Sequence, residues 1–324
     1  MEFILKPPDL TDYAAGNTGT EGVWQFDSGT PGPNVVITAL VHGNELCGAW
    51  ALIKLLENEV KPNRGKLTLI FCNLEAFRNF NAKYHDQSRF VDEDMNRVWS
   101  DAKLAQTVTQ ELRRARDLQP YIAQADWLLD LHSMHEVGAP LLLTGLLPRN
   151  LALAFKLGAP QHIVVDAGHQ DGIRMRDYGH LGQADGTACA LLLECGFHGD
   201  PASVGVAADM AARFLLASGA VQPGGVLAQW LAPLPLQQTA VQVTHAIVAQ
   251  SDKLTFSQGW QGLQCIARAG TELARDGSLV HVTPYDNCTL IMPSLRQLRA
   301  GVTVMRLAQP MVATPNAIIN IANY

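Results

Sequence analysis

Three runs of apolar residues in this chain each lead directly into a side chain that can take part in metal chemistry. The runs over 35–41, 127–131 and 188–193 are followed by His42, His132 and Glu194. Runs of this length, rich in β-branched and aliphatic residues, are typical of buried strands in a mostly parallel sheet. Ligands of such sheets bind outside the carboxyl ends of the strands, so we expect these three side chains to lie close together there.

The tetrapeptide His42-Gly43-Asn44-Glu45 lies where the first strand passes into a helix predicted over 46–57. Two histidines and a carboxylate are one of the usual ligand sets of catalytic zinc, which keeps a fourth position open for water. The H-x-x-E pattern is common by chance, and a histidine at a strand end often has only a structural role. The hypothesis of a zinc hydrolase therefore depends on all three residues falling at the same end of predicted strands. A second argument is that burying the carboxylate of Glu194 is costly unless the group has a charged partner or a functional role.

A polar segment without apolar periodicity follows the next predicted strand. Residues 81–97 contain two arginines, an asparagine and several acids, and in isolation they fit a solvated surface loop equally well. The motif R-x-x-x-x-D-x-N-R, after H-G-N-E and before D-L-H and a strand-final glutamate, resembles the motifs of the succinylglutamate desuccinylase/aspartoacylase family. This family is related to the zinc carboxypeptidases, and the resemblance spans roughly residues 35 to 200.

The resemblance implies a zinc-dependent hydrolase that cleaves the amide bond of a small N-acyl amino acid. It implies one zinc ion per chain, held by His42, Glu45 and His132. Glu194 matches the catalytic carboxylate, which takes a proton from the attacking water and passes it to the leaving amine. Arg89 matches the arginine that polarises the scissile carbonyl, where a cation stabilises the developing oxyanion.

The same resemblance assigns the residues that hold the substrate. Asn96 and Arg97 match the pair that binds the substrate's carboxylate, for which the guanidinium fork is suited. Asp94 matches the acid that orients a zinc-bound histidine. After Glu194 the chain continues Cys195-Gly196-Phe197-His198, which departs from the family pattern. The acyl group, the amino acid and the choice between an amide and an ester bond therefore stay open.

Two other functions fit the same residues. One is a zinc carboxypeptidase or esterase acting on a different small acidic substrate. The other is a metal-binding relative without catalysis, which the presence of both Glu194 and Arg89 disfavours. His135 would be a fourth ligand only if its segment were helical, and Cys195 would be a nucleophile only beside a histidine base. Roles in substrate recognition are left open for Arg174, Arg176 and Tyr285.

The charge balance excludes a nucleic-acid-binding protein and favours an enzyme of small molecules. A net charge of −6 and a pI of about 5.9 give no basic surface, so an anionic substrate needs local arginines. No stretch approaches the ~20 apolar residues of a membrane span, and the first residues lack the features of a signal peptide. The six scattered cysteines fit a reducing compartment. We expect a cytoplasmic enzyme with a small acidic substrate and without nucleic-acid or membrane partners; self-association stays open.

Strands alternate with helices over the first two thirds of the chain. Further strands are predicted over 140–144 and 162–166, and further helices over 104–125 and 201–217. The charged stretch 111–117 is expected to form a solvated helix face. This alternation predicts an α/β fold with a mixed, mostly parallel sheet sandwiched by helices, which the resemblance identifies as zinc carboxypeptidase-like.

A proline-spaced linker near 231–238 marks a change in composition. Beyond it, short β-prone runs are separated by glycine or proline. We expect a catalytic α/β domain over 1–232 and a smaller all-β domain over 239–324. The resemblance implies that the β domain partly covers the active site.

Overall fold

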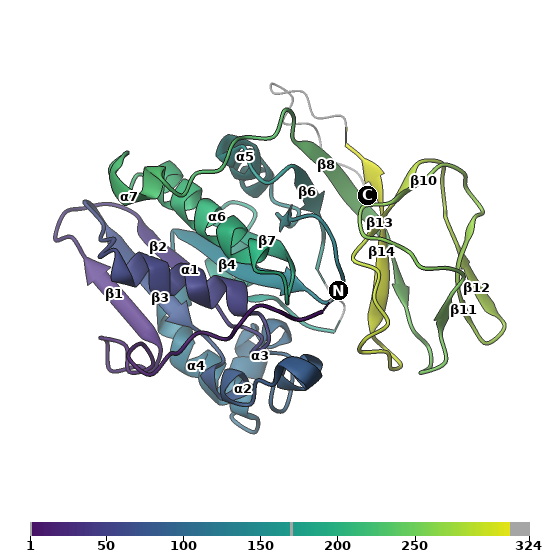
Figure 1. Cartoon of the computed structure of the whole chain (residues 1–324), viewed down its shortest axis with the longest axis horizontal. Coiled ribbons are helices and arrows are strands. Elements are labelled where there is room, and N and C mark those ends of the chain that lie inside the picture. The colour runs from purple at the N-terminus through teal and green to yellow at the C-terminus, as the bar shows by residue number, and fades with distance from the viewer. Residues whose placement is uncertain (1, 169–170, 312–324) are drawn as a thin grey trace.

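The computed structural model describes residues 2–168 and 171–311, and its central feature is one large mixed sheet with helices on both faces (Figure 1). The sheet has eleven strands among the described residues, in the order β1 (Val23–Asp27), β3 (Lys66–Phe71), β2 (Asn34–Ala39), β4 (Trp127–Met134), β7 (Cys189–Phe197), β5 (Leu141–Leu143), β6 (His162–Val165), β8 (Thr239–Val248), β14 (Thr303–Pro310), β13 (Cys288–Ile291) and β10 (Cys265–Ile266). The α-helices are α1 (Leu46–Glu57), α2 (Leu74–Arg78), α3 (Asp101–Leu104), α4 (Gln110–Ile122), α5 (Pro148–Leu157), α6 (Ala202–Ser218) and α7 (Gly225–Ala228).

The strands that carry the predicted site residues form the parallel centre of this sheet. β2 pairs in parallel with β3 and β4, and β4 pairs in parallel with β7. β1 and β5 run antiparallel to their neighbours β3 and β7. The predicted α/β fold with a mixed, mostly parallel sheet is therefore confirmed.

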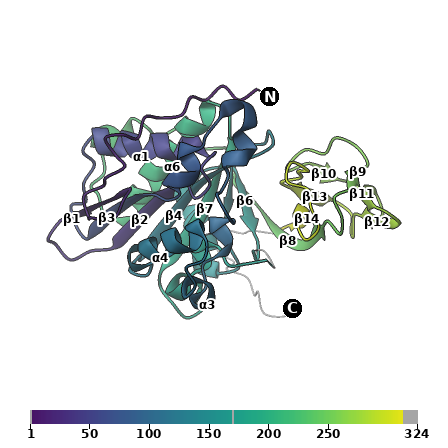
Figure 2. The same ribbon diagram turned by 90° about the horizontal axis from the view of Figure 1, so that it is seen from below.

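Side chains of the central strands alternate between two apolar cores. Val35 and Ile37 of β2 pack with α1 and α6, whereas Val36 packs on the other face with α4. Figure 2 shows these helices on opposite sides of the sheet. Leu129 and Leu131 of β4 lie on the face of the sheet that packs against α1. Because side chains alternate along a strand, Asp130 and its even-numbered neighbours lie on the opposite face.

The strands that bear His132 and Glu194 do not end at those residues. β4 continues to Met134 and β7 continues to Phe197. The two strands stay paired there, and His132 lies directly opposite Glu194 in the register. The expectation that each polar residue follows its strand was wrong by two or three residues, but the pairing itself brings the two side chains together.

The helix expected over 104–125 is two helices. α3 ends at Leu104 and α4 begins only at Gln110, after a short exposed turn. The Thr109 hydroxyl accepts a hydrogen bond from the Leu112 N–H at 3.1 Å, which caps the second helix. Threonine favours a helix cap over a helix interior because its hydroxyl bonds to nearby backbone.

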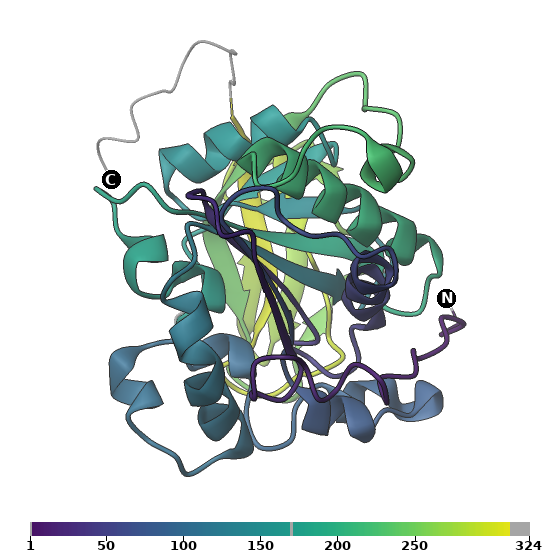
Figure 3. The same cartoon turned by 90° about the vertical axis from the view of Figure 1, so that its left-hand side faces the viewer.

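The C-terminal strands extend the large sheet rather than standing apart from it. β8 pairs in parallel with β6, and β14 then pairs antiparallel with β8. A separate small sheet has the order β12 (Leu279–Val282), β11 (Glu272–Asp276) and β9 (Thr255–Phe256). Figure 3 shows the green and yellow C-terminal strands behind the teal strands and running across them.

The predicted boundary between the domains falls just before β8, yet hydrogen bonds of the sheet cross it. Residues 312–324 of the predicted second domain lie outside the described residues. The division into 1–232 and 239–324 thus stays a prediction. Within the part of the chain that the structure describes, no helix is long and apolar enough to cross a membrane.

Candidate active site

One cavity of about 170 Å³ lies at the carboxyl ends of the central strands. The structure brings all eight of the predicted site residues to its wall, namely His42, Glu45, Arg89, Asp94, Asn96, Arg97, His132 and Glu194. The C-terminal region contributes to the same wall through the segment 292–306. These residues come from positions up to 264 apart in the sequence (306 minus 42), so only the fold brings them together.

The turn between β2 and α1 presents the first two of these side chains. Leu40 has a positive φ of 57°, which reverses the chain after the strand. Glu45 then lies at the N-cap position of α1. A side chain at Gly43 would collide with the backbone of Ala76, Phe77 and Ser88. Because only glycine fits there, the turn packs tightly against the segment that carries the arginines, and the Gly43 N–H bonds to the Arg89 carbonyl at 3.0 Å.

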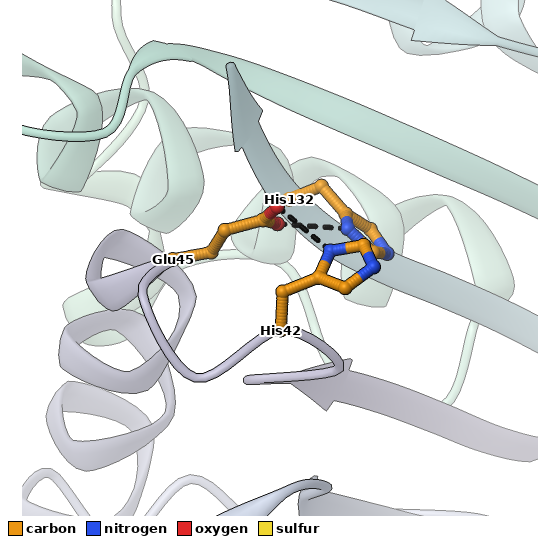
Figure 4. Close-up of side chains that lie close together, drawn as sticks. All are labelled: His42, Glu45 and His132. Carbon is orange, nitrogen blue, oxygen red and sulfur yellow. Dashed lines mark hydrogen bonds and ion pairs between the residues drawn. The ribbon is translucent and has the colours of Figure 1, made fainter. Parts of the chain in front are cut away.

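The side chains of His42, Glu45 and His132 converge on a common point (Figure 4). The Nδ1 atoms of His42 and His132 lie 2.7 and 2.8 Å from the two carboxylate oxygens of Glu45. One ligand atom from each residue falls within 4.8 Å of the others, and all three residues are buried. Among the described residues, His42, Glu45 and His132 form the one group of three or more histidines, cysteines and acids that lie close enough together to hold a metal ion.

Each histidine is oriented from behind by a second carboxylate. The Nε2 of His42 lies 2.9 Å from Asp94 Oδ1, and the Nε2 of His132 lies 2.8 Å from Asp130 Oδ2. Such partners fix the ring orientation and raise the basicity of a ligand. Sequence reasoning identified Asp94 but missed Asp130. The signal was present, since residues two apart in a strand share a face and the motif D-x-H places both on one side of β4.

The charges of this cluster fit a divalent cation. Three buried or half-buried carboxylates, those of Glu45, Asp94 and Asp130, surround two imidazoles. Burial opposes ionisation of Glu45, but His42 and His132 outweigh it and hold the pKa of Glu45 well below its usual range. A buried group of carboxylates needs positive charge in its centre. The Nδ1 edges of two oriented imidazoles and a carboxylate are a donor set that zinc prefers.

Glu194 lies beside this cluster and has an unpartnered oxygen. Its carboxyl group is buried, and Oε2 has no hydrogen-bond partner among the described atoms. Burial and the negative charge of Glu45 raise the pKa of Glu194 to about 8. A divalent cation at the neighbouring ligands would act in the opposite direction and favour the ionised carboxylate. A buried acid with a perturbed pKa in a cleft is typical of a functional group rather than a structural one.

The guanidinium of Arg89 reaches into the cavity between two acids. Nη1 lies 3.2 Å from Glu45 Oε1, and Nη2 lies 3.1 Å from Asp94 Oδ2. Arg97 is further along the wall, where its Nε lies 3.2 Å from Asp171 Oδ1. Asn96 accepts a hydrogen bond from the Met175 N–H at 3.0 Å through its side-chain oxygen. This bond leaves the Asn96 amide N–H groups available to a ligand.

Three further arginines line the cavity: Arg174, whose role the sequence left open, and Arg299 and Arg306, which it did not single out. Arg174 and Arg306 are buried and both contact the carboxylate of Asp166, at 3.0 and 3.5 Å, and Arg299 lies on the same wall. Burial lowers the pKa of Arg306 to about 10, and repulsion from Arg174 adds to the effect although Asp166 opposes it. Arg306 comes from β14, and nothing local in its sequence marks it as a site residue.

Three other candidates lie elsewhere. Arg176 is buried beside Asp177 and does not line the cavity. The Tyr285 hydroxyl bonds to Thr244 within the C-terminal strands. Cys195 is on the α1 and α6 face of β7, opposite to the cavity, and burial with the nearby Cys47 raises the pKa of its thiol well above the usual value. Such a thiol is a poor nucleophile.

The segment that carries Arg89, Asp94 and Arg97 is held in shape by a buried acid. The carboxylate of Glu111 in α4 accepts hydrogen bonds from the backbone N–H groups of residues 91, 92 and 93 at 2.7 to 3.2 Å. It also accepts one from the Asn73 amide at 2.9 Å. Glu111 and Arg114 are buried, so the expectation of a solvated face over 111–117 was wrong for these two residues.

Replacing this acid is expected to destabilise the protein. Glu111→Ala leaves three backbone N–H groups and one amide without their charged acceptor, so the free energy of unfolding should fall by about 3 kcal/mol. Denaturant unfolding measures the change. Arg113→Ala, on the exposed side of the same helix, is the matched control and should stay within about 0.5 kcal/mol of the parent. Equal effects of the two substitutions would contradict the supporting role of Glu111.

Comparison with known proteins agrees with this geometry. Residues 31–185 match the model of the succinylglutamate desuccinylase/aspartoacylase catalytic domain. A succinylglutamate desuccinylase of Paraburkholderia xenovorans is 28% identical over 302 residues, which cover 85% of this chain and 82% of that protein. One of Burkholderia lata is 28% identical over 352 residues, covering 97% and 94% of the two chains.

Solved structures show the same fold at lower identity. A succinylglutamate desuccinylase of Vibrio cholerae superposes with a TM-score of 0.66 at 17% identity, covering 90% of this chain and 86% of that one. The product-bound ectoine utilization protein EutE of Ruegeria pomeroyi gives a TM-score of 0.61 at 18% identity, covering 86% of each chain.

The mixed sheet and its flanking helices have the zinc carboxypeptidase-like fold of these solved structures, and the cavity lies at the strand ends. Within that fold, residues 31–185 are similar to the catalytic domain of the succinylglutamate desuccinylase/aspartoacylase family, and most of the chain is similar to the two succinylglutamate desuccinylases. The matched catalytic domain ends at residue 185, before Glu194, so the assignment of that residue depends on geometry. Its position opposite His132 in the β4–β7 register is the relevant observation.

Proposed function

We propose that this protein is a zinc-dependent deacylase that cleaves the amide bond of a small N-acyl amino acid. The observation that carries the proposal is the convergence of His42, Glu45 and His132 beside the unpartnered carboxyl group of Glu194. His42, Glu45 and His132 would hold one zinc ion. Zinc at such a site lowers the pKa of water to about 7 and polarises a carbonyl group.

The protein's own side chains supply the remaining parts of the mechanism. Glu194 lines the same cavity and has an oxygen without a hydrogen-bond partner. It takes a proton from the attacking water and passes that proton to the leaving amine. Arg89 stabilises the negative charge that develops on the carbonyl oxygen. Arg97 and Asn96, which line the same cavity, hold the carboxylate of the amino acid through a guanidinium and an amide.

The charge of the cavity indicates an anionic substrate. Its described wall contains five arginines (Arg89, Arg97, Arg174, Arg299 and Arg306) and four carboxylates (Glu45, Asp94, Asp171 and Glu194). A divalent ion would add two further positive charges. Behind the wall, Asp130 pairs with His132, and Asp166 pairs with Arg174 and Arg306, so only a small positive excess remains. This excess favours a substrate that carries a carboxylate over a neutral one.

A substrate panel tests the proposal. Zinc-loaded protein is supplied with N-succinyl, N-acetyl and longer N-acyl derivatives of acidic and neutral amino acids, and with matched esters and short peptides. We expect amide hydrolysis that is fastest for acidic derivatives. Faster cleavage of peptides at their C-terminus would instead indicate a carboxypeptidase, and faster cleavage of the esters an esterase. Binding without turnover of any compound would indicate a non-catalytic relative.

Arg97→Ala is expected to raise KM for acidic substrates about 10- to 100-fold, because a bound carboxylate loses a charged hydrogen-bonding partner. Arg89→Ala should mainly lower kcat, since its contact strengthens only as the oxyanion forms. Steady-state kinetics separate the two effects, with the exposed and remote Arg113→Ala as control. An unchanged KM for Arg97→Ala across all acidic substrates would reject the assigned role in carboxylate binding.

A further inference from the structure

A row of polar side chains connects the guanidinium of Arg89 to the C-terminal region. His135, just after β4, lies with its Nε2 3.4 Å from Arg89 Nη1. Its Nδ1 lies 3.0 Å from Asp86 Oδ1. The other oxygen of Asp86 lies 3.4 Å from Nη1 of Arg296, in the segment between β13 and β14. None of His135, Asp86 and Arg296 has a part in the mechanism described above.

The direction of these hydrogen bonds follows from the donor and acceptor chemistry. A guanidinium only donates, so the Nε2 of His135 must accept and carries no proton. The proton of a neutral ring is then on Nδ1, from which it is donated to the carboxylate of Asp86. His198 fits this arrangement when its Nδ1 donates to the Ser133 hydroxyl at 2.8 Å, because its Nε2 then carries no proton and can face the Nδ1–H of His135 at 3.3 Å.

A neutral hydrogen-bond acceptor beside Arg89 can orient the guanidinium without neutralising its positive charge. The two other groups on this guanidinium, Glu45 and Asp94, are carboxylates, which hold it but also neutralise its charge. The imidazole of His135 fixes the direction of Nη1 without adding negative charge. A cation that is held in place and not further neutralised is what stabilisation of an oxyanion requires.

We propose that His135, held by Asp86, is a positioning residue that aims the guanidinium of Arg89 at the carbonyl oxygen of the substrate. The proposal rests on the deacylase function proposed above. It gives the C-terminal segment a part in catalysis, since Arg296 holds Asp86 and thereby the ring of His135. Burial lowers the pKa of His135, which agrees with a neutral ring.

The first test is a double-mutant cycle on the zinc-loaded protein with its fastest N-acyl amino acid. His135→Leu should lower kcat about tenfold and leave KM within about twofold, because the loss affects only the transition state. In the Arg89→Ala background the same substitution should cost nothing further. If His135→Leu lowers kcat equally in both backgrounds, or raises KM instead, His135 does not act through Arg89 and the proposal is overturned.

Two conservative variants separate positioning from a structural role. The amide of His135→Gln reaches the position of Nε2 and can accept from Arg89, so kcat should largely recover. The amide of His135→Asn reaches only the position of Nδ1 and contacts Asp86, so kcat should stay low. Recovery by Asn and not by Gln would overturn the proposal. Zinc content and thermal unfolding of each variant identify any loss that comes from misfolding.

A spectroscopic measurement tests the geometry independently of any activity. The ¹⁵N NMR signals of His135, assigned by their loss in His135→Gln, should show a neutral ring protonated at Nδ1 at pH 7. A proton on Nε2 would exclude acceptance from Arg89 and reject the positioning role even in an active enzyme. The expected tautomer in a protein that hydrolyses none of the panel would reject the deacylase function and leave the side-chain arrangement intact.

Discussion

Glu194→Gln is expected to yield a folded, zinc-loaded protein whose kcat is lower by at least the ~10²-fold that loss of a general base costs. Glutamine keeps the size and shape of the side chain but cannot take a proton from water. Glu194 is not one of the three converging ligand residues, so the metal should stay bound. Metal analysis and steady-state kinetics on the same preparation give both results.

The matched control for this experiment is Cys195→Ala, at the next position of β7. Its side chain lies on the opposite face of the strand, so kcat should be almost unchanged although some stability is lost from the core. Loss of zinc from the Glu194→Gln protein would make Glu194 a ligand and require a different mechanism. Full activity of that variant would mean that another group of the cavity is the base, and His135, which contacts Arg89, is then the first candidate.

His132→Ala should abolish both zinc binding and hydrolysis. The substitution removes one of the three ligands and leaves the carboxylates of Glu45 and Asp130 without the imidazole between them. The parent protein should contain one zinc ion per chain, lose activity with a chelator and regain it when zinc is added back. Atomic absorption after dialysis, with kinetics, measures these outcomes.

Two other substitutions serve as an intermediate case and as a negative control for zinc binding. Asp130→Asn keeps the ligand but weakens the partner that orients it, and should reduce zinc affinity about 10- to 100-fold. His245→Ala removes an exposed histidine of the C-terminal strands and should leave the zinc content unchanged. Retention of one zinc ion per chain by His132→Ala would contradict the assigned ligand set.

Local patterns explain why the central elements were predictable. A buried parallel strand requires a continuous apolar run, and a helix that packs on a sheet requires apolar residues at helical spacing. Helix α1 has the predicted bounds, 46–57, and the predicted turn with His42 and Glu45 precedes it. The side chain of Glu45 reaches the same point as His42 because only two residues lie between them within one tight turn.

Other features depend on contacts that have no local signature. Glu111 belongs to a charged stretch that looks solvated, but α4 turns its carboxylate toward the backbone of residues 91–93. Arg306 is separated from Arg97 by more than two hundred positions, and only the pairing of β14 with β8 brings it to the cavity. The burial of a single charged residue depends on which helix or strand packs over it. The residues next to it in the sequence do not reveal that partner.

The sequence by itself determined the parallel centre of the sheet and its polar residues, because periodicity, turn chemistry and ligand type act over a few neighbouring residues. Only the tertiary structure decided that His132 lies opposite Glu194, since this pairing depends on the register of two strands far apart in the chain. The same holds for Asp86, His135 and Arg296, which meet because three distant segments pack against one another. Contacts of this kind are set by the packing of whole elements, for which the chain carries no local pattern.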